Sequence, residues 1–160
     1  MDIFIDTIDV KLLEALQDDA SQSNQALAAR AHISPPTCLR RIKRLRDAGL
    51  IEREIAILNA DKLANTLGHG LTALVEITLD RQGAEQQEVF EARVLPDGAV
   101  QQCYRVSPGP DFILVVHVRD MPAYLTLAQR LFTSDANVRN VKAFFSVKRS
   151  KFEPKLLLAQ

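Results

Sequence analysis

The spacing of apolar residues changes between residues 52 and 70. Before this stretch, apolar side chains recur at the three- and four-residue intervals typical of amphipathic helices. After it, segments in which apolar residues stand at every second position, as in strands, are interspersed with segments of helical spacing. A chain of 160 residues is long enough for two small domains. We therefore expect an α+β protein, with a helical domain over 1–54, a connecting strand or linker over 55–69, and a second domain over 70–160.

Three short helices are expected in the first domain. Ser23 and Ser34 are good N-caps for the second and third, and Pro35 suits the first position of the third. A tight turn at His32 separates these two, which is typical of a helix-turn-helix. The expected helices are about Thr7–Gln17, Asn24–Ala31 and Ser34–Asp47, with Gly49 at the C′ position, a β wing or hairpin over Leu50–Leu58 and a turn over Asn59–Asp61.

The second half of the chain predicts the order β-α-β-β-α-β. Leu71, Ala73, Val75, Ile77 and Leu79 alternate along the first run, as on one face of a strand. This order of elements is that of a ferredoxin-like domain. The expected strands are about Gly70–Leu79, Val100–Val106, Phe112–Val118 and Val138–Val147, and the expected helices are about Ala84–Val94 and Asp120–Phe132.

The third helix carries the most informative charges in the chain. The 20 basic and 20 acidic side chains balance overall, so any basic surface must be local. On a helical wheel Cys38, Ile42 and Leu45 share one side, which predicts a buried back. Between Ser34 and Arg46 there are five basic residues and no acid: Arg40, Arg41, Lys43, Arg44 and Arg46.

This helix is the candidate DNA-binding element. A charge run alone is more often solvated surface, but this one follows a helix and a tight turn and precedes a glycine. Arginine can pair with guanine edges in the major groove, and helix N-termini and other cations can hold phosphates. We expect Arg40, Lys43 and Pro36 to face bases. The candidate phosphate contacts are Ser34, Thr37, Arg41 and Arg44, although Arg41 could instead brace the domain through an internal ion pair. Pro35 is a further candidate DNA-binding residue.

The same segment resembles a known family. The run from Ile33 to Ile51 is similar to the Lrp/AsnC (feast/famine) recognition helix, with the pattern S-P-x-x-C-L-R-R-x-K-x-L-x-x-x-G-[IVL]-I. Residues 5–13 resemble the first helix of that family. The second half resembles its regulatory domain (RAM/ACT-like) in the order of elements.

This resemblance implies a transcription regulator with a winged helix-turn-helix and no enzymatic activity. It implies a homodimer built through the C-terminal sheets, assembling further into tetramers or octamers. Such a dimer would place two recognition helices on a pseudo-palindromic operator in double-stranded DNA. Independently, the run Phe112–Val118 is apolar on both faces, so we expect a second cover such as a partner sheet. The alternative is that this run is a central strand with one face exposed to solvent.

The resemblance also implies a small-molecule effector, possibly an amino acid, at the loop between the second and third strands. Asp111 matches the family's aspartate, but Gly109 lies two residues before it instead of about three, and prolines flank this glycine. The candidate residues are Ser107, Gly109 and Asp111, with Ser146 as a weaker one. The alternative is a stiff hairpin turn in which Asp111 bonds to its own backbone.

Other classes of site lack their motifs. The sequence contains no HExxH, GxGxxG or P-loop, and Cys38 and Cys103 belong to no CxxC pair, so we expect no metal and no cofactor. No apolar run reaches membrane-spanning length and no secretory signal is evident, which predicts a cytoplasmic protein. Two alternatives remain open: a tetrapyrrole decarboxylase-like enzyme using His117 and Arg105, and a low-specificity architectural DNA-binding protein.

Overall fold

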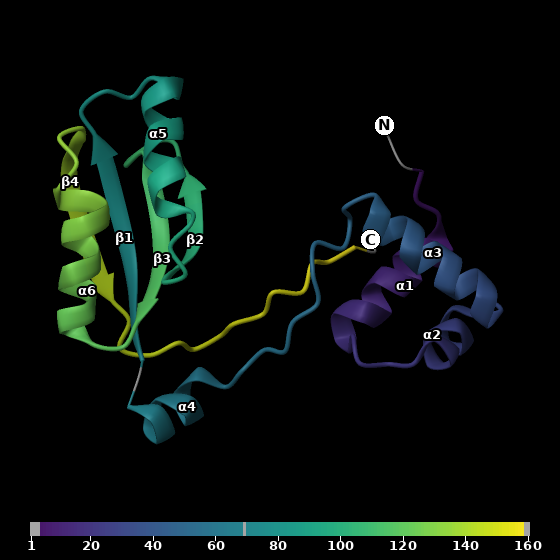
Figure 1. Cartoon of the computed structure of the whole chain (residues 1–160). Coiled ribbons are helices and arrows are strands. Elements are labelled where there is room, and N and C mark those ends of the chain that lie inside the picture. The colour runs from purple at the N-terminus through teal and green to yellow at the C-terminus, as the bar shows by residue number, and fades with distance from the viewer. Residues whose placement is uncertain (1–3, 69, 159–160) are drawn as a thin grey trace. The chain divides into compact units, whose positions relative to one another are not determined.

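The chain folds into two compact units (Figure 1). The computed structural model describes residues 4–68 and 70–158. The first unit runs up to Ile57 and also includes the C-terminal segment from Lys151, whereas the second comprises Leu58–Ser150. The C-terminal segment, which the sequence analysis assigns to the second domain, thus groups with the first unit.

The first unit contains the helices α1 (Thr7–Asp18), α2 (Asn24–Ala31) and α3 (Pro35–Asp47). The Asp6 carboxylate caps α1 by accepting the amides of Ile8 at 3.0 Å and Asp9 at 2.9 Å. Ser23 caps α2, and Gly49 follows α3 with a φ of +73°. These helices lie within a residue of the expected bounds, because their cap residues are strong local signals.

The three helices share one small core. Its buried residues include the expected back of α3, so the predicted orientation of this helix is confirmed. The buried side chains are Leu12, Ala15, Leu27, Ala28, Ala31, Cys38, Ile42 and Leu45.

The expected β wing or hairpin over Leu50–Leu58 is not formed. Residues 52–59 adopt neither helix nor strand, and Ile55, Ile57 and Leu58 are exposed. A strand needs a hydrogen-bonding neighbour. The sheet that the structure describes contains only strands of the second unit, so residues 52–59 have no strand with which to pair.

The expected turn over Asn59–Asp61 is instead the start of α4 (Ala60–Leu67). The Asn59 side chain accepts the Lys62 amide at 2.9 Å and caps the helix. None of the helix's residues is buried, although Ala60, Leu63, Ala64 and Leu67 recur at helical spacing.

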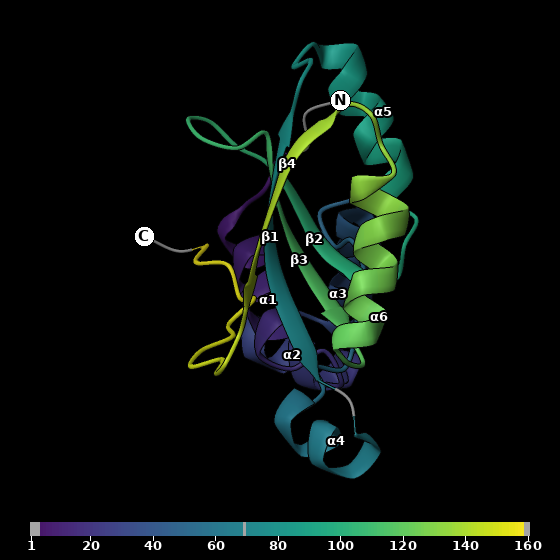
Figure 2. The same ribbon diagram turned by 90° about the vertical axis from the view of Figure 1, so that its left-hand side faces the viewer.

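The second unit is a four-stranded antiparallel sheet with two helices on one face, α5 (Ala84–Val94) and α6 (Met121–Ala128) (Figure 2). A π-helical turn over Gln129–Thr133 extends α6, so the expected helix changes form near its end. The strand order β2-β3-β1-β4 confirms the ferredoxin-like prediction. The strands are β1 (Leu71–Leu79), β2 (Val100–Arg105), β3 (Phe112–Val118) and β4 (Val138–Phe145).

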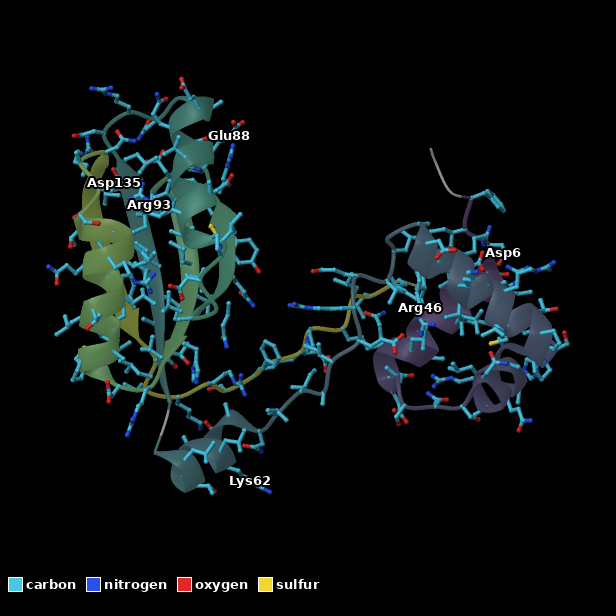
Figure 3. All side chains as sticks on the ribbon, in the orientation of Figure 1. Asp6, Arg46, Lys62, Glu88, Arg93 and Asp135 are labelled. Carbon is cyan, nitrogen blue, oxygen red and sulfur yellow. The ribbon has the colours of Figure 1, made fainter. Side chains whose placement is uncertain are left out.

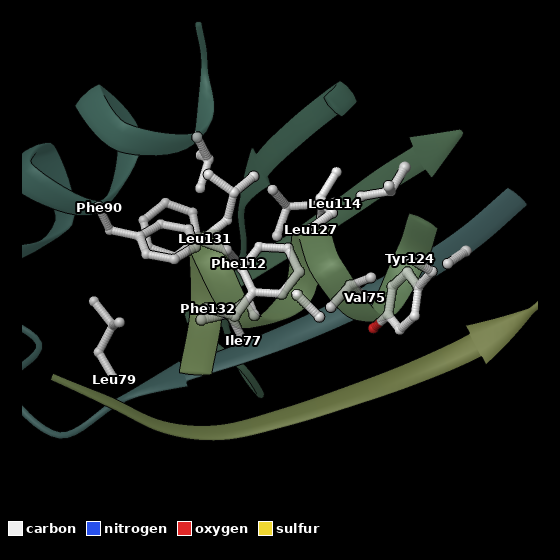
Figure 4. Close-up of a cluster of buried hydrophobic side chains, with 14 residues drawn as sticks. Val75, Ile77, Leu79, Phe90, Phe112, Leu114, Tyr124, Leu127, Leu131 and Phe132 are labelled. Atoms are coloured by element: carbon white, nitrogen blue, oxygen red, sulfur yellow. The ribbon is translucent and has the colours of Figure 1, made fainter. Parts of the chain in front are cut away.

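The core of this unit lies between the sheet and the helices. Phe90 of α5 packs against Phe112 of β3, with ring centroids 4.6 Å apart, and against Phe132, at 6.5 Å (Figure 4). An ion pair between Arg93 and Asp135 joins α5 to the segment before β4 (Figure 3). The helices therefore cover one face of the sheet.

The opposite face of the sheet carries apolar side chains without a helical cover. Leu74 of β1 lies between Val115 of β3 and Phe144 of β4, and its side chain is 44% exposed. Tyr104 of β2 lies across from Ile113 of β3 on the same face. We call Leu74, Tyr104, Ile113, Val115 and Phe144 the open-face patch. The strand β3 is thus apolar on both faces, as its sequence predicts.

Candidate DNA-binding surface and effector loop

The exposed side of α3 presents two cations. Arg40 and Lys43 are both exposed, one turn apart, on the side opposite the buried Cys38 and Ile42. Within the described part of the chain, neither Arg40 nor Lys43 forms an ion pair. Their charges are therefore available to an external anion.

Two other basic residues of α3, the half-buried Arg41 and the exposed Arg44, pair with aspartates at the start of α1. Nη1 of Arg41 lies 2.8 Å from Oδ2 of Asp6 and 2.9 Å from Oδ1 of Asp9. Arg44 pairs with the second oxygen of Asp9, and it also donates to the Phe4 carbonyl at 3.3 Å. The suggested internal brace for Arg41 is therefore present. Arg44, which the sequence analysis expects at a DNA phosphate, also pairs with an aspartate, Asp9.

Asp9 is the residue that the sequence analysis missed. Its side chain is 1% exposed, yet it carries the two guanidinium contacts and accepts the Asp6 amide at 3.2 Å. Asp6 and Asp9 cap each other's amides reciprocally, which places both carboxylates at the start of α1. The three-residue spacing of these two aspartates is the signal that could have revealed the pair.

The electrostatics of this cluster favour its charged form. The pKa of Asp6 is lowered, first by the hydrogen bond from the Asp9 amide and then by the Arg41 guanidinium. The hydrogen bonds that Arg41 donates to the carboxylates of Asp6 and Asp9 raise the pKa of Arg41. The cluster thus fixes α3 against α1 through charges that both helices contribute.

The turn before α3 is fixed by polar contacts. Asn24 of α2 donates from Nδ2 to the Pro35 carbonyl at 2.8 Å, and His32 adopts the left-handed conformation with a φ of +55°. Ser34 stands at the N-cap position but makes no capping bond, because its hydroxyl pairs with that of Thr37 at 2.8 Å. Ser34, Pro35 and Pro36 are exposed and Thr37 is half-buried, so this end of α3 is accessible.

The candidate effector loop lies between β2 and β3. Ser107 and Gly109 are exposed, whereas Asp111 is 8% exposed. Oδ2 of Asp111 accepts the Leu79 amide at 2.7 Å and Nε2 of Gln82 at 3.3 Å. Asp111 therefore anchors the loop to the end of β1, a long-range contact that differs from the local turn considered as the alternative.

Ser146 lies away from this loop within one chain. Its amide donates to the Thr72 carbonyl at the start of β1, whereas Asp111 bonds at the other end of that strand. These positions on β1 are about 20 Å apart at the usual rise per strand residue. One chain therefore does not bring Ser146 together with Ser107, Gly109 and Asp111.

The residues expected for an enzymatic alternative do not converge. His117 lies opposite Thr72 and shares a hydrogen bond with its hydroxyl at 2.9 Å, on the open face of the sheet. Arg105 lies opposite Phe112 on the helix-covered face, where its Nε donates to Glu91 of α5 at 2.6 Å. The two candidates thus sit on opposite faces.

Among residues 4–68 and 70–158, no group of three or more potential ligands is arranged to hold a metal ion. None of the helices described is both long enough and apolar enough to cross a bilayer.

Comparison with known families accounts for both units. Residues 5–52 match the family of winged helix-turn-helix DNA-binding domains, and residues 72–156 match the Lrp/AsnC ligand-binding domain. The second match alone spans more than half of the chain and includes the four strands of the sheet except Leu71 at the start of β1.

Individual relatives extend over nearly the whole chain. The leucine-responsive regulatory protein of Rhizobium meliloti is 33% identical over 147 residues, covering 92% of this chain and 92% of the relative. That of Escherichia coli K12 is 32% identical over 154 residues, covering 96% and 92%.

Two solved structures share the fold. A Neisseria meningitidis transcriptional regulator, in complex with L-methionine, superposes with a TM-score of 0.82 at 28% identity, covering 96% of this chain and 97% of its own. An AsnC family regulator from Agrobacterium tumefaciens gives 0.82 at 27% identity, with the same coverage. All four relatives are named as regulators. The chain belongs to the Lrp/AsnC family of transcriptional regulators.

Proposed function

We propose that this regulator reads a specific duplex DNA sequence with the exposed side of α3. The observation that carries the proposal is the division of its basic residues: Arg40 and Lys43 are open, whereas Arg41 and Arg44 are held by Asp9. An α-helix in the major groove needs an apolar back and a cationic front. In this proposal Arg40, Lys43 and Pro36 meet base edges. Ser34, Pro35 and Thr37 lie near the phosphate backbone.

The roles proposed for Arg41 and Arg44 differ from those expected from the sequence. Both would position α3 against α1 and not hold phosphates. Turning either side chain toward DNA would leave part of the Asp9 carboxylate without its partner, and an uncompensated buried charge is costly.

The proposed working form is a homodimer that covers the open-face patch. Leu74 and Phe144 are substantially exposed there, although an antiparallel sheet normally shows a polar outer face. A second copy would bury the same patch on both chains in a two-fold contact. A two-fold dimer suits a pseudo-palindromic operator, and further assembly to tetramers or octamers would extend the contact with DNA.

An amino acid is the effector class that the relatives favour. The similar regulator from Neisseria meningitidis was solved with L-methionine. In this chain the exposed loop with Ser107 and Gly109 is the proposed site, and Asp111 anchors the end of that loop to β1. Because Ser146 lies at the other end of β1, it would join such a site only from another copy.

The proposed division of labour follows the two units. The unit up to Ile57 would bind DNA, and the unit Leu58–Ser150 would bind the effector and assemble. The connecting segment proposed for residues 55–69 includes the junction between the units at residues 57–58, and residue 69 lies outside the described residues. A role at the chromosome would place the protein in the cytoplasm.

Selection of genomic DNA fragments by the purified chain, with and without each amino acid, tests the proposal. The expected result is enrichment of a pseudo-palindromic motif, with the enrichment changed by at least one amino acid. Specific regulators exceed their own non-specific affinity by about 10³-fold or more. Recovery of random sequence under all conditions would contradict specific recognition and favour an architectural role.

A further inference from the structure

The C-terminal segment of the first unit is docked against the end of α1 (Figure 1). Nε2 of Gln17 donates to the Leu156 carbonyl at 3.1 Å, and Oε1 of Gln17 accepts the Leu156 amide at 2.7 Å. These are the two hydrogen bonds that a residue of a neighbouring β-strand would exchange with Leu156. The side-chain amide of Gln17 thus recognises the backbone of an extended segment, whatever its side chains are.

The adjacent pair of residues adds a charge contact. The Lys155 ammonium pairs with the carboxylate of Asp18, which also binds Arg30 of α2. The pKa of Asp18 is lowered, first by the hydrogen bond from Lys155 and then by the one from Arg30. Successive residues of α1 therefore hold successive residues of the segment. The ion pair between Lys155 and Asp18 therefore sets the register of the segment along α1.

This docking does not extend the apolar core. The side chains of Leu156 and Leu157 are 68% and 95% exposed. The core of the first unit consists of residues from α1, α2 and α3, with neighbours at Ile33 and Ile51. The contacts that Gln17 and Asp18 make with the segment are therefore separable from the apolar core of the unit.

We propose that Gln17 and Asp18 form a docking site for an extended segment with a lysine followed by any residue, and that its occupant is the chain's own C-terminal segment. The chain passes through the whole second unit between Leu58 and Ser150 before it returns. The docked segment is thus a second covalent connection to the helix-turn-helix unit, in addition to the one at residues 57–58. This role goes beyond DNA and effector binding.

Amide hydrogen exchange in the full-length chain, followed by NMR, tests the docking directly. The Leu156 amide is expected to exchange about tenfold more slowly than that of its exposed neighbour Leu157, as one net hydrogen bond allows. Gln17→Ala is expected to remove this difference. Gln25→Ala, which changes an exposed glutamine of α2, should preserve it. Equal exchange at Leu156 and Leu157 in the unaltered chain, or protection that survives Gln17→Ala, would overturn the proposal.

A mixing experiment tests the occupant. Isotope-labelled Gln17→Ala chains, which keep the segment but lack its site, are refolded together with unlabelled chains that end at Ser150. If the segment docks only within its own chain, the labelled Leu156 amide stays unprotected in the mixture. Recovery of its protection would show that the segment reaches a second copy and would overturn the own-chain assignment.

Discussion

Asp9 of α1 is buried at 1% exposure, and its carboxylate binds the guanidinium of Arg44 from α3. Arg41, nearly one turn earlier on α3, reaches the other carboxylate oxygen at 2.9 Å. The contact explains how a helix rich in arginine can be both a structural element and a DNA-facing one. Arg41 and Arg44 are paired with aspartates, whereas Arg40 and Lys43 form no ion pair within the described residues.

Replacing Asp9 by alanine is expected to destabilise the helical unit by up to about 3 kcal/mol, because the exposed Arg44 loses its carboxylate partner and the half-buried Arg41 keeps only Asp6. Urea unfolding followed by helical circular dichroism measures the change. The chain has 2 tyrosines and no tryptophan, and both tyrosines, Tyr104 and Tyr124, lie in the second unit. The tyrosine fluorescence transition should therefore stay unchanged. Asp47→Asn, at an exposed position of α3, is the matched control. If both substitutions lower the free energy of unfolding by the same small amount, the ion pairs of Asp9 do not stabilise the helical unit.

Asp6 predicts a pH dependence of the same unit. Its pKa lies below the ordinary value of 3.8, so its charge stabilises the fold above that pH. The stabilisation is lost as pH falls below about 4 and the carboxylate protonates. Asp6→Asn keeps a good N-cap while removing the charge. The difference in unfolding free energy between the two chains should therefore shrink between about pH 5 and about pH 2. A constant difference across that range of urea titrations would argue against a charge effect.

The sequence predicted most elements but not the partners that individual residues find. Caps and periodic burial located α1, α2, α3 and the four strands. Asn59 was taken for a turn residue, although the apolar residues that follow it, Ala60, Leu63, Ala64 and Leu67, recur at helical spacing and its side chain caps the helix. The wing segment has strand-like composition but no neighbour with which to pair.

Long-range contacts were the harder part of the prediction. Asp9 was passed over because a single acidic residue in a first turn is common, and only the fold brings Arg41 and Arg44 to it. Likewise, the distance between Asp111 and Ser146 follows from the register of β1 with β3 and β4. Local sequence does not specify that register completely.

Leu74→Asp is expected to weaken self-association. Leu74 is at the centre of the open-face patch, between Val115 and Phe144, and a carboxylate there would have to be desolvated in any dimer that covers the patch. Sedimentation velocity should show a smaller species than the unaltered chain. Leu125→Asp changes an exposed leucine of α6 and should leave the mass unchanged. If Leu74→Asp also keeps the original mass, the dimer uses another surface.

Asp111→Ala is expected to cost the second unit about 1–3 kcal/mol, since the Leu79 amide would lose its acceptor in a buried position. Tyrosine fluorescence during urea unfolding reports on this unit. Ser107→Ala, in the exposed part of the same loop, should have little effect on stability. A stable Asp111→Ala chain would show that the aspartate is not the anchor of the loop.

The central claim is that the open side of α3 reads DNA, and the most direct measurement compares two arginine substitutions on the selected operator. In gel-shift titrations, Arg40→Ala should weaken operator binding about tenfold or more, since a bidentate guanine contact provides about 1–3 kcal/mol of discrimination. Arg139→Ala removes the same charge from an exposed position on β4 and should leave the affinity unchanged. Operator affinity that is the same for Arg40→Ala and the unaltered chain would contradict the account.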